Sequence, residues 1–128
     1  MRAAVLRFAL KVAALMVLAW GPLLQAADGP LRIIVIVAPG GSADAMARMV
    51  GEKLGPLLNT VTVVENKPGA GGNLATQLVA KAPADGLTLL VTANNHTINP
   101  TLFADAGYSI DDLVPIADLM WGPSVIVV

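Results

Sequence analysis

Short runs rich in Ile and Val alternate with helix-like segments along the middle of the chain. The apolar runs cover residues 31–37, 61–64 and 87–92, and the segments 43–57 and 73–81 place apolar side chains at helical spacing. Strands with few polar residues are typical of parallel sheets that are buried on both faces. The pattern therefore predicts an α/β fold: a βαβαβ unit with right-handed crossovers and strands in the spatial order 2-1-3.

Polar residues mark the start of each predicted helix. Ser42 and Asn73 are suited to cap the two helices, and Asp44 places a carboxylate in the first turn of the first helix. After an irregular stretch, further strands are expected at 114–120 and 124–128. The apolar residues expected on the buried helix faces are Met46, Met49, Val50 and Leu54 in the first helix and Leu74, Leu78 and Val79 in the second.

Two glycine-rich loops follow the first two predicted strands, at residues 38–44 and 66–73. The carboxyl ends of parallel strands lie at one edge of a sheet, where ligands bind in open α/β folds. Glycine lets backbone N–H groups approach a ligand closely, and each following helix directs its free N–H groups and positive dipole end to the same place. We therefore expect a site for a small anion, with Gly40, Gly41, Ser42, Gly71, Gly72 and Asn73 as its candidate ligand-binding residues.

A polar loop, residues 93–97, follows the third predicted strand and should reach the same edge. Asn94 and His96 are its candidate ligand contacts, and the alternative is a capped loop that binds nothing. His96 is the only histidine, and it is expected to form loop hydrogen bonds; a small hydrolase using His96 with Ser42 is a further alternative, but no orienting acid is evident. Asp44 is expected to cap its helix and to support the site from behind, and no residue is expected to be catalytic.

Other kinds of site find no support in the sequence. Gly41 is followed by Ser42 and Ala43 without the lysine of a phosphate-binding P-loop, and the glycine spacing of a dinucleotide-binding loop is not met. The chain has no cysteine, and its nine acidic residues lack metal-ligand spacing. No metal and no cofactor are therefore expected.

The first 27 residues have the order of a secretory signal peptide. Arg2, Arg7 and Lys11 precede an apolar stretch at 12–20, and small residues suited to cleavage follow at 25–27. A membrane anchor is the alternative, but the apolar stretch is shorter than the roughly 20 residues that a span needs. We therefore expect export from the cytoplasm with cleavage after residue 26 or 27, and an α/β lobe at residues 28–128.

The charge of that lobe argues against nucleic acid as a partner. After residue 27, five Lys and Arg stand against nine Asp and Glu, so the formal net charge is −4. An acidic protein that binds an anion must do so with local dipoles rather than with a general positive field.

Several strings resemble one known family. APGGSAD at 38–44, VVENKPGAGGN at 63–73, DGLTLL at 85–90 and the segment 92–100 are similar to the Bug family, the extracytoplasmic solute receptors of tripartite tricarboxylate transporters. The resemblance implies a periplasmic receptor of the Venus flytrap type, not an enzyme, that closes two lobes on a small carboxylate. It also implies that membrane components of the transporter are partners, and that the two glycine loops form the ligand surface of the first lobe.

The sequence departs from the family pattern at three places. Ile36 and Val37 replace the usual Pro-Phe before the first loop, and Ala75 stands where glycine is common. The chain also ends where family members cross into the second lobe, so a truncated receptor that does not function alone is expected. A structural or regulatory single-lobe fragment that binds no ligand is the alternative.

Overall fold

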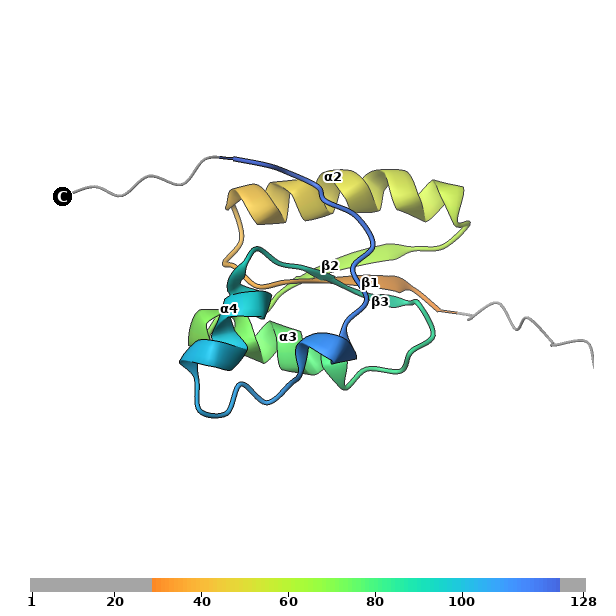
Figure 1. Cartoon of the computed structure of the whole chain (residues 1–128). Coiled ribbons are helices and arrows are strands. Elements are labelled where there is room, and N and C mark those ends of the chain that lie inside the picture. The colour runs from red at the N-terminus through yellow and green to blue at the C-terminus, as the bar shows by residue number, and fades with distance from the viewer. Residues whose placement is uncertain (1–28, 123–128) are drawn as a thin grey trace, which may run out of the picture.

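A parallel three-stranded sheet forms the centre of the molecule (Figure 1). The computed structural model describes residues 29–122. The strands are β1 (Leu31–Val35), β2 (Thr62–Asn66) and β3 (Thr88–Val91), and their order is β2-β1-β3. Both pairings are parallel, so the predicted order 2-1-3 is confirmed.

Helices cover both faces of the sheet. Figure 1 shows α2 (Ser42–Leu57) on one face and α3 (Asn73–Ala80) with α4 (Asn95–Leu102) on the other. Two short 3₁₀ turns, η1 (Ala70–Gly72) and η2 (Ile110–Asp112), precede α3 and follow α4. None of the helices in residues 29–122 is long and apolar enough to cross a membrane.

The side chains of β1 alternate between two cores because successive residues of a strand point to opposite faces. The core on the α2 side contains Ile33, Val35 and Ala47. The core on the α3 side contains Ile34, Ile36 and Ala75. Burial on both faces explains why the residues of β1 are apolar apart from Arg32.

Small residues make the most buried contacts of α2 with the sheet, and of the four apolar residues predicted to face inward Met46, Val50 and Leu54 are half-buried. Ala47, Gly51 and Gly55 are buried, whereas Met49 is 61% exposed, so its predicted inward position is wrong. A Cβ at Gly51 would lie 2.8 Å from Thr62 Cγ2, so helix and strand are too close there for a larger residue. In α3, Leu78 and Val79 pack inward as expected, but Leu74 is 55% exposed because Ala75 occupies the buried face.

The helix starts also differ from prediction. Gly41 and Gly72 occupy the N-cap positions, and neither cap has a side-chain hydrogen bond. Ser42 and Asn73 are instead the first helical residues of α2 and α3. The predicted polar loop at 93–97 is largely helical because α4 begins within it.

The carboxyl-terminal part of the described chain forms no strand. Residues 114–120 pair with no strand in the described part of the chain and are largely exposed, so the strand predicted there is wrong. A strand needs a neighbour to satisfy its backbone, and the described sheet offers none at this position. The strand predicted at 124–128 and the signal peptide predicted at 1–27 lie outside the described residues.

Candidate functional site

Three loops meet at the carboxyl edge of the sheet. They connect β1 to α2, β2 to α3 and β3 to α4, and the amino ends of all three helices lie at this edge (Figure 1). The candidate residues Gly40, Gly41 and Ser42 belong to the first connection. Those at 71–73 belong to the second, and Asn94 and His96 belong to the third. The structure therefore gathers the predicted loops at one edge, as parallel strand order requires.

The turn between β2 and α3 has an unusual backbone. Gly69, Ala70, Gly71 and Gly72 have successive φ values of 131°, 47°, 63° and 98°. Only glycine adopts such angles without steric cost, so Ala70 carries some strain. Gly72 also lies against the side chain of Ile36, because a Cβ at Gly72 would lie 3.4 Å from Ile36 Cβ. The turn therefore lies close against β1.

A buried pair of asparagines holds this turn to α4. Asn99 Nδ2 donates to Asn73 Oδ1 at 2.7 Å and to the Gly71 carbonyl at 3.0 Å. Asn73 and Asn99 are 4% and 5% exposed. The Asn73 side chain is therefore directed into the protein, and its backbone is the part that remains for a ligand at the loop surface.

A second asparagine on α4 contacts the same carbonyl. Asn95 Nδ2 donates to the Gly71 carbonyl at 3.2 Å, one helical turn before Asn99. Residues four apart lie on the same face of a helix, so α4 presents both donors to the turn. One carbonyl oxygen has two lone pairs, and here both are used.

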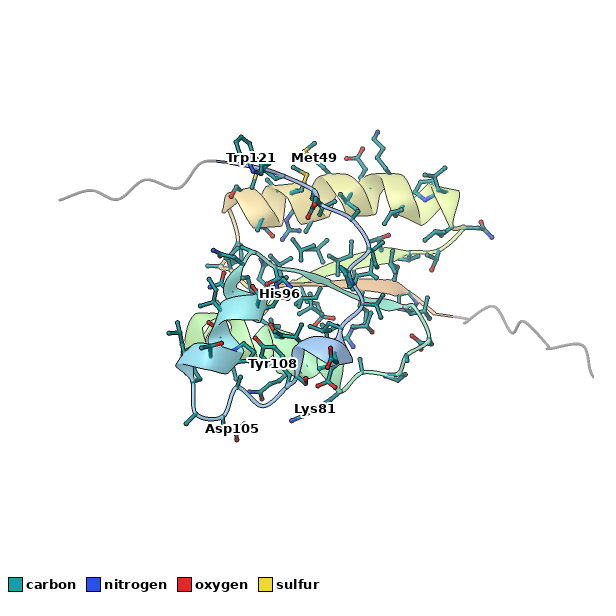
Figure 2. The ribbon with its side chains drawn as sticks, viewed as in Figure 1. Met49, Lys81, His96, Asp105, Tyr108 and Trp121 are labelled. Atoms are coloured by element: carbon teal, nitrogen blue, oxygen red, sulfur yellow. The ribbon has the colours of Figure 1, made fainter. Side chains whose placement is uncertain are left out.

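Pro100 lies inside α4 and removes one backbone hydrogen bond. A proline has no N–H group, so the carbonyl four residues earlier, that of His96, loses its helical donor. The Tyr108 hydroxyl donates to this carbonyl at 3.1 Å (Figure 2). Burial raises the pKa of Tyr108, so the hydroxyl keeps its proton for this bond.

The His96 ring, in the first turn of α4, is hydrogen-bonded to the loop that precedes this helix. His96 Nδ1 lies 2.8 Å from the Ala93 carbonyl, which can only accept, so Nδ1 carries the proton. Within residues 29–122, no hydrogen bond joins His96 to Ser42. His96 therefore donates to the loop that precedes α4, and the pairing with Ser42 that the hydrolase alternative needs is not formed in residues 29–122.

The first glycine loop is stabilised by Asp44. Asp44 Oδ2 accepts the N–H of Gly40 at 2.9 Å, so this N–H is already used inside the protein. Arg48 contacts the same carboxylate with Nη2 3.0 Å from Oδ1 and Nε 3.1 Å from Oδ2. Asp44 is 5% exposed and supports the loop from inside the protein, but it is not the N-cap of α2 that the sequence predicts, because Gly41 occupies that position.

Asn66 extends this cluster to the end of β2. Its Nδ2 donates to Asp44 Oδ1 at 3.0 Å and to the Val37 carbonyl at 3.0 Å. Hydrogen bonds from Arg48, the Gly40 N–H and Asn66 lower the pKa of Asp44 from 3.8 to about 2. Asp44 therefore remains ionised at neutral pH and is fully paired.

The N–H of Ser42 donates to no protein acceptor in the described part of the chain. The first helical bond of α2 runs from the Ala45 N–H to the Gly41 carbonyl, so earlier N–H groups of this turn are free for other acceptors. The Ser42 side chain is exposed at the helix start. Asn94, the N-cap residue of α4, is exposed as well.

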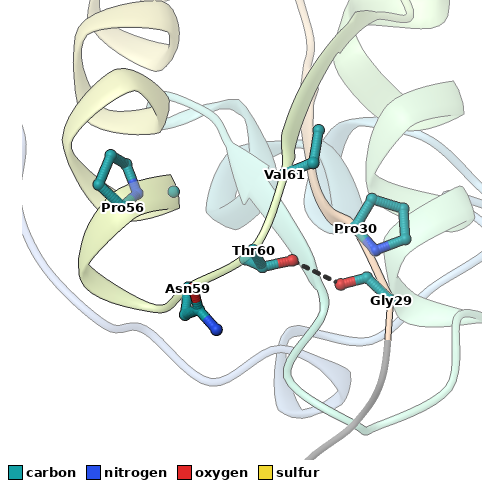
Figure 3. Close-up of a pocket in the computed structure, with 7 residues that line it drawn as sticks. Gly29, Pro30, Pro56, Asn59, Thr60 and Val61 are labelled. Carbon is teal, nitrogen blue, oxygen red and sulfur yellow. Dashed lines mark hydrogen bonds between the residues drawn. The ribbon is translucent and has the colours of Figure 1, made fainter.

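An open depression of about 640 Å³ lies at the other end of the sheet (Figure 3). It is next to the amino ends of β1 and β2, where Thr60 Oγ1 donates to the Gly29 carbonyl at 2.7 Å. It is lined by Gly29, Pro30, Gly55, Pro56, Asn59, Thr60 and Val61. None of the candidate residues lines it. In residues 29–122, no three His, Asp or Glu side chains are grouped to hold a metal ion.

Sequence reasoning missed several residues that shape the site. The pair Asp44 and Arg48 has the i, i+4 spacing of a helical ion pair and could have been found. Asn95 and Asn99 have the same spacing, but Asn95 was expected in the loop 93–97 and no helix was expected there. Tyr108 has no signal in the sequence, because its contact with α4 depends on the fold.

A family model for the tripartite tricarboxylate transporter family receptor matches residues 46–128. This chain belongs to that family. The resemblance to Bug proteins is thereby confirmed, and it extends to named relatives. The protein BugT of Bordetella pertussis is 38% identical over 101 residues, covering 77% of this chain and 31% of BugT. A UPF0065 protein of Bordetella bronchiseptica is 38% identical over 101 residues, covering 77% of this chain and 30% of that protein.

Solved structures share the fold of this family member. The periplasmic binding protein BugD is 39% identical with a TM-score of 0.59, covering 62% of this chain and 27% of BugD. An R. palustris protein solved with adipate is 29% identical with a TM-score of 0.57, covering 65% of this chain and 28% of that protein. The expected single α/β lobe of a periplasmic-binding-protein fold is confirmed. The chain spans about 30% of the length of its curated relatives.

Proposed function

We propose that this chain supplies one lobe of a periplasmic receptor that captures a small carboxylate for a tripartite transporter. Membership in the receptor family and similarity to BugT and BugD support a solute-binding role. The adipate in the R. palustris neighbour supports a carboxylate as the class of ligand. The proposal includes export with removal of residues 1–27, docking to the membrane components of the transporter, and no catalysis.

The observation that carries the proposal is the meeting of three helix amino ends at one sheet edge. Each helix start directs free N–H groups and a partial positive charge outward, which favours an anion there. The first turns of α3 and α4 contain no acidic residue, and the only acid in the first turn of α2 is Asp44. Arg48 forms an ion pair with Asp44, so this acid adds little negative charge at the edge. The free N–H groups can then bind a carboxylate without a cationic side chain in direct contact with it.

Affinity of this lobe alone is expected to be low. Each hydrogen bond to a charged group contributes about 1.5–3 kcal/mol, and the exposed loop edge places such bonds near the lower value. Association costs at least about 4 kcal/mol in lost freedom. Binding by one lobe should therefore be weak, with closure of a second lobe supplying the remaining contacts.

Titration by NMR can test weak binding residue by residue. Adipate is added to the purified ¹⁵N-labelled chain, and its neutral diamide serves as the matched control. We expect adipate, but not the diamide, to shift the amide signals of Gly41, Ser42 and the 71–73 segment. If adipate and a panel of dicarboxylates and tricarboxylates shift no signal at this edge, the chain does not bind carboxylates and the structural-fragment alternative is favoured.

Ser42 offers a sharp variant because it is the first residue of α2. Proline is well accepted at this position, and Gly41, with φ −78° and ψ 168°, already has the extended backbone that precedes proline. Ser42→Pro therefore removes one N–H group while keeping the helix, and Ser42→Ala removes only the hydroxyl. We expect Ser42→Pro to weaken adipate binding more than Ser42→Ala does. Equal affinities in the two variants would count against the α2 end of the site.

A further inference from the structure

We propose that Asn99 is a positioning residue of the carboxylate site, and that it acts by fixing the conformation of the turn at 69–72. This inference rests on the proposed function, because it concerns how the same site is shaped. Asn99 is 5% exposed, so its side chain cannot reach a ligand at the loop surface. Its effect on binding must therefore pass through the residues that it contacts.

The hydrogen bonds of Asn99 have a fixed direction. The Gly71 carbonyl can only accept, so the Asn99 atom 3.0 Å from it is the amide nitrogen. The same nitrogen faces Asn73 at 2.7 Å, so Asn73 must present its oxygen there. Asn99 is thus the donor to two acceptors, one in the turn and one at the start of α3.

The turn needs such an anchor because its backbone is costly. Four successive residues have positive φ, and one of them, Ala70, is not glycine. The bond within the turn, from the Gly72 N–H to the Gly69 carbonyl at 2.9 Å, is accompanied by the two bonds that α4 makes to Gly71. Losing Asn99 removes one donor from the Gly71 carbonyl and leaves the buried Asn73 side chain less satisfied, which favours rearrangement of the turn.

The two asparagines allow a matched test of this direction. Asn73→Asp keeps an oxygen facing Asn99, so the turn should stay in place. Asn99→Asp makes the same chemical change at the other end of the bond, but it removes both donors and sets a carboxylate against the Gly71 carbonyl. The expected result is faster hydrogen exchange of the Gly72 amide and displaced Gly71–Asn73 signals in Asn99→Asp, and parental behaviour in Asn73→Asp.

The effect of Asn99 on ligand binding is measured with neutral variants, because an added negative charge would itself repel an anion. Asn99→Leu should lower adipate affinity about tenfold, the loss expected when the hydrogen bond that fixes the turn is removed. Thr101→Ala, at an exposed position of the same helix, is the control and should bind like the parent. A parent chain that binds neither adipate nor the panel of dicarboxylates and tricarboxylates refutes the proposed function, whereas the exchange measurement separately decides whether Asn99 fixes the turn.

A further variant covers the case in which the Asn99 variants do not fold. Asn95→Ala removes the other donor to the Gly71 carbonyl from a half-buried position, and it should speed Gly72 exchange less strongly than Asn99→Asp. The proposal is overturned if Asn99→Asp and Asn95→Ala both leave Gly72 exchange at the parental rate. It is equally overturned if Asn73→Asp speeds exchange as much as Asn99→Asp, since the pair would then serve only to fill a buried space.

Discussion

The Asn66 carboxamide donates a 3.0 Å hydrogen bond to Asp44 Oδ1, which joins the end of β2 to the first turn of α2. The same nitrogen donates to the Val37 carbonyl at 3.0 Å. Val37 directly precedes the first glycine loop, residues 38–44, and Asp44 is the last residue of that loop, so the Asn66 side chain holds both ends of it. Asn66 is also the first residue of the second glycine loop, so the two loops are fixed relative to each other.

Asn66→Leu should destabilise the protein. The substitution leaves the Val37 carbonyl without this donor and takes one partner from a buried carboxylate, so we expect the free energy of unfolding to fall by about 1–3 kcal/mol. Urea unfolding followed by circular dichroism measures the change. Thr101→Leu, an exposed polar-to-leucine change, is the control and should stay within about 0.5 kcal/mol of the parent. Equal stability of Asn66→Leu and Thr101→Leu would contradict the role of Asn66 in holding the two ends of the first glycine loop.

The pH dependence of stability should report on Asp44. Its pKa is lowered from 3.8 to about 2, so its ionised form favours the folded state. The stabilisation is complete above the ordinary pKa and is lost as the pH falls from about 4 toward 2. We expect urea midpoints of the parent to fall across this range more steeply than those of Asp44→Asn.

The Asp44→Asn comparison separates Asp44 from other acids. The hydrogen bond from Arg32 to Glu65 also lowers the pKa of Glu65, so Glu65 makes stability depend on pH in the same direction as Asp44 does. Glu65 is present in both proteins, and the difference between the two pH profiles therefore belongs to Asp44. Parallel profiles would show that Asp44 has an ordinary pKa in the folded state.

Gly51→Val should be destabilising because α2 lies so close to β2. A Cβ at Gly51 would lie 2.8 Å from Thr62 Cγ2 and 3.4 Å from Ile33 Cδ1. Overpacking of this kind costs about 1–3 kcal/mol. Lys53→Val introduces the same side chain at an exposed position of the same helix and should cost less than about 1 kcal/mol. Thermal unfolding of both variants checks the contrast, and a more stable Gly51→Val would refute the close packing.

Tyr108→Phe should weaken α4. It removes the hydroxyl that donates to the His96 carbonyl, and Pro100 supplies no helical donor in its place. We expect a loss of about 1 kcal/mol in the free energy of unfolding. Pro100→Ala restores an N–H group for the same carbonyl, so Tyr108→Phe should cost less in that background. A double-mutant cycle by urea unfolding measures the coupling, and additive effects would disprove it.

Much of the fold could be predicted because it follows from local patterns. The run that contains Ile33–Ile36 has few polar residues, which is typical of a strand buried on both faces, and the sheet order follows from the crossovers. The glycine loops could also be predicted from a local pattern, because glycine permits the backbone angles that these turns require.

The helix α4 escaped prediction because its residues favour turns. Asn, Thr and Pro have low helix propensity, and Pro100 removes a helical hydrogen bond. Contacts from outside the helix offset this preference: Tyr108 caps the free carbonyl, and Gly71 accepts from two asparagines on one face. The strand expected at 114–120 is absent for the converse reason. Its residues favour a strand locally, but the described sheet offers no neighbouring strand with which they could pair.

The sequence by itself determined the order of elements from β1 to β3, the sheet topology and the edge at which the glycine loops meet, because these depend on hydrophobic period and backbone freedom. Only the tertiary structure decided which polar side chains are bonded inside the protein and which face outward. Asn73 and Asn99 are 26 positions apart, and Asp44 and Asn66 are 22 apart. The burial of a polar side chain depends on the partner that the fold brings to it, and no local pattern in the chain records that partner.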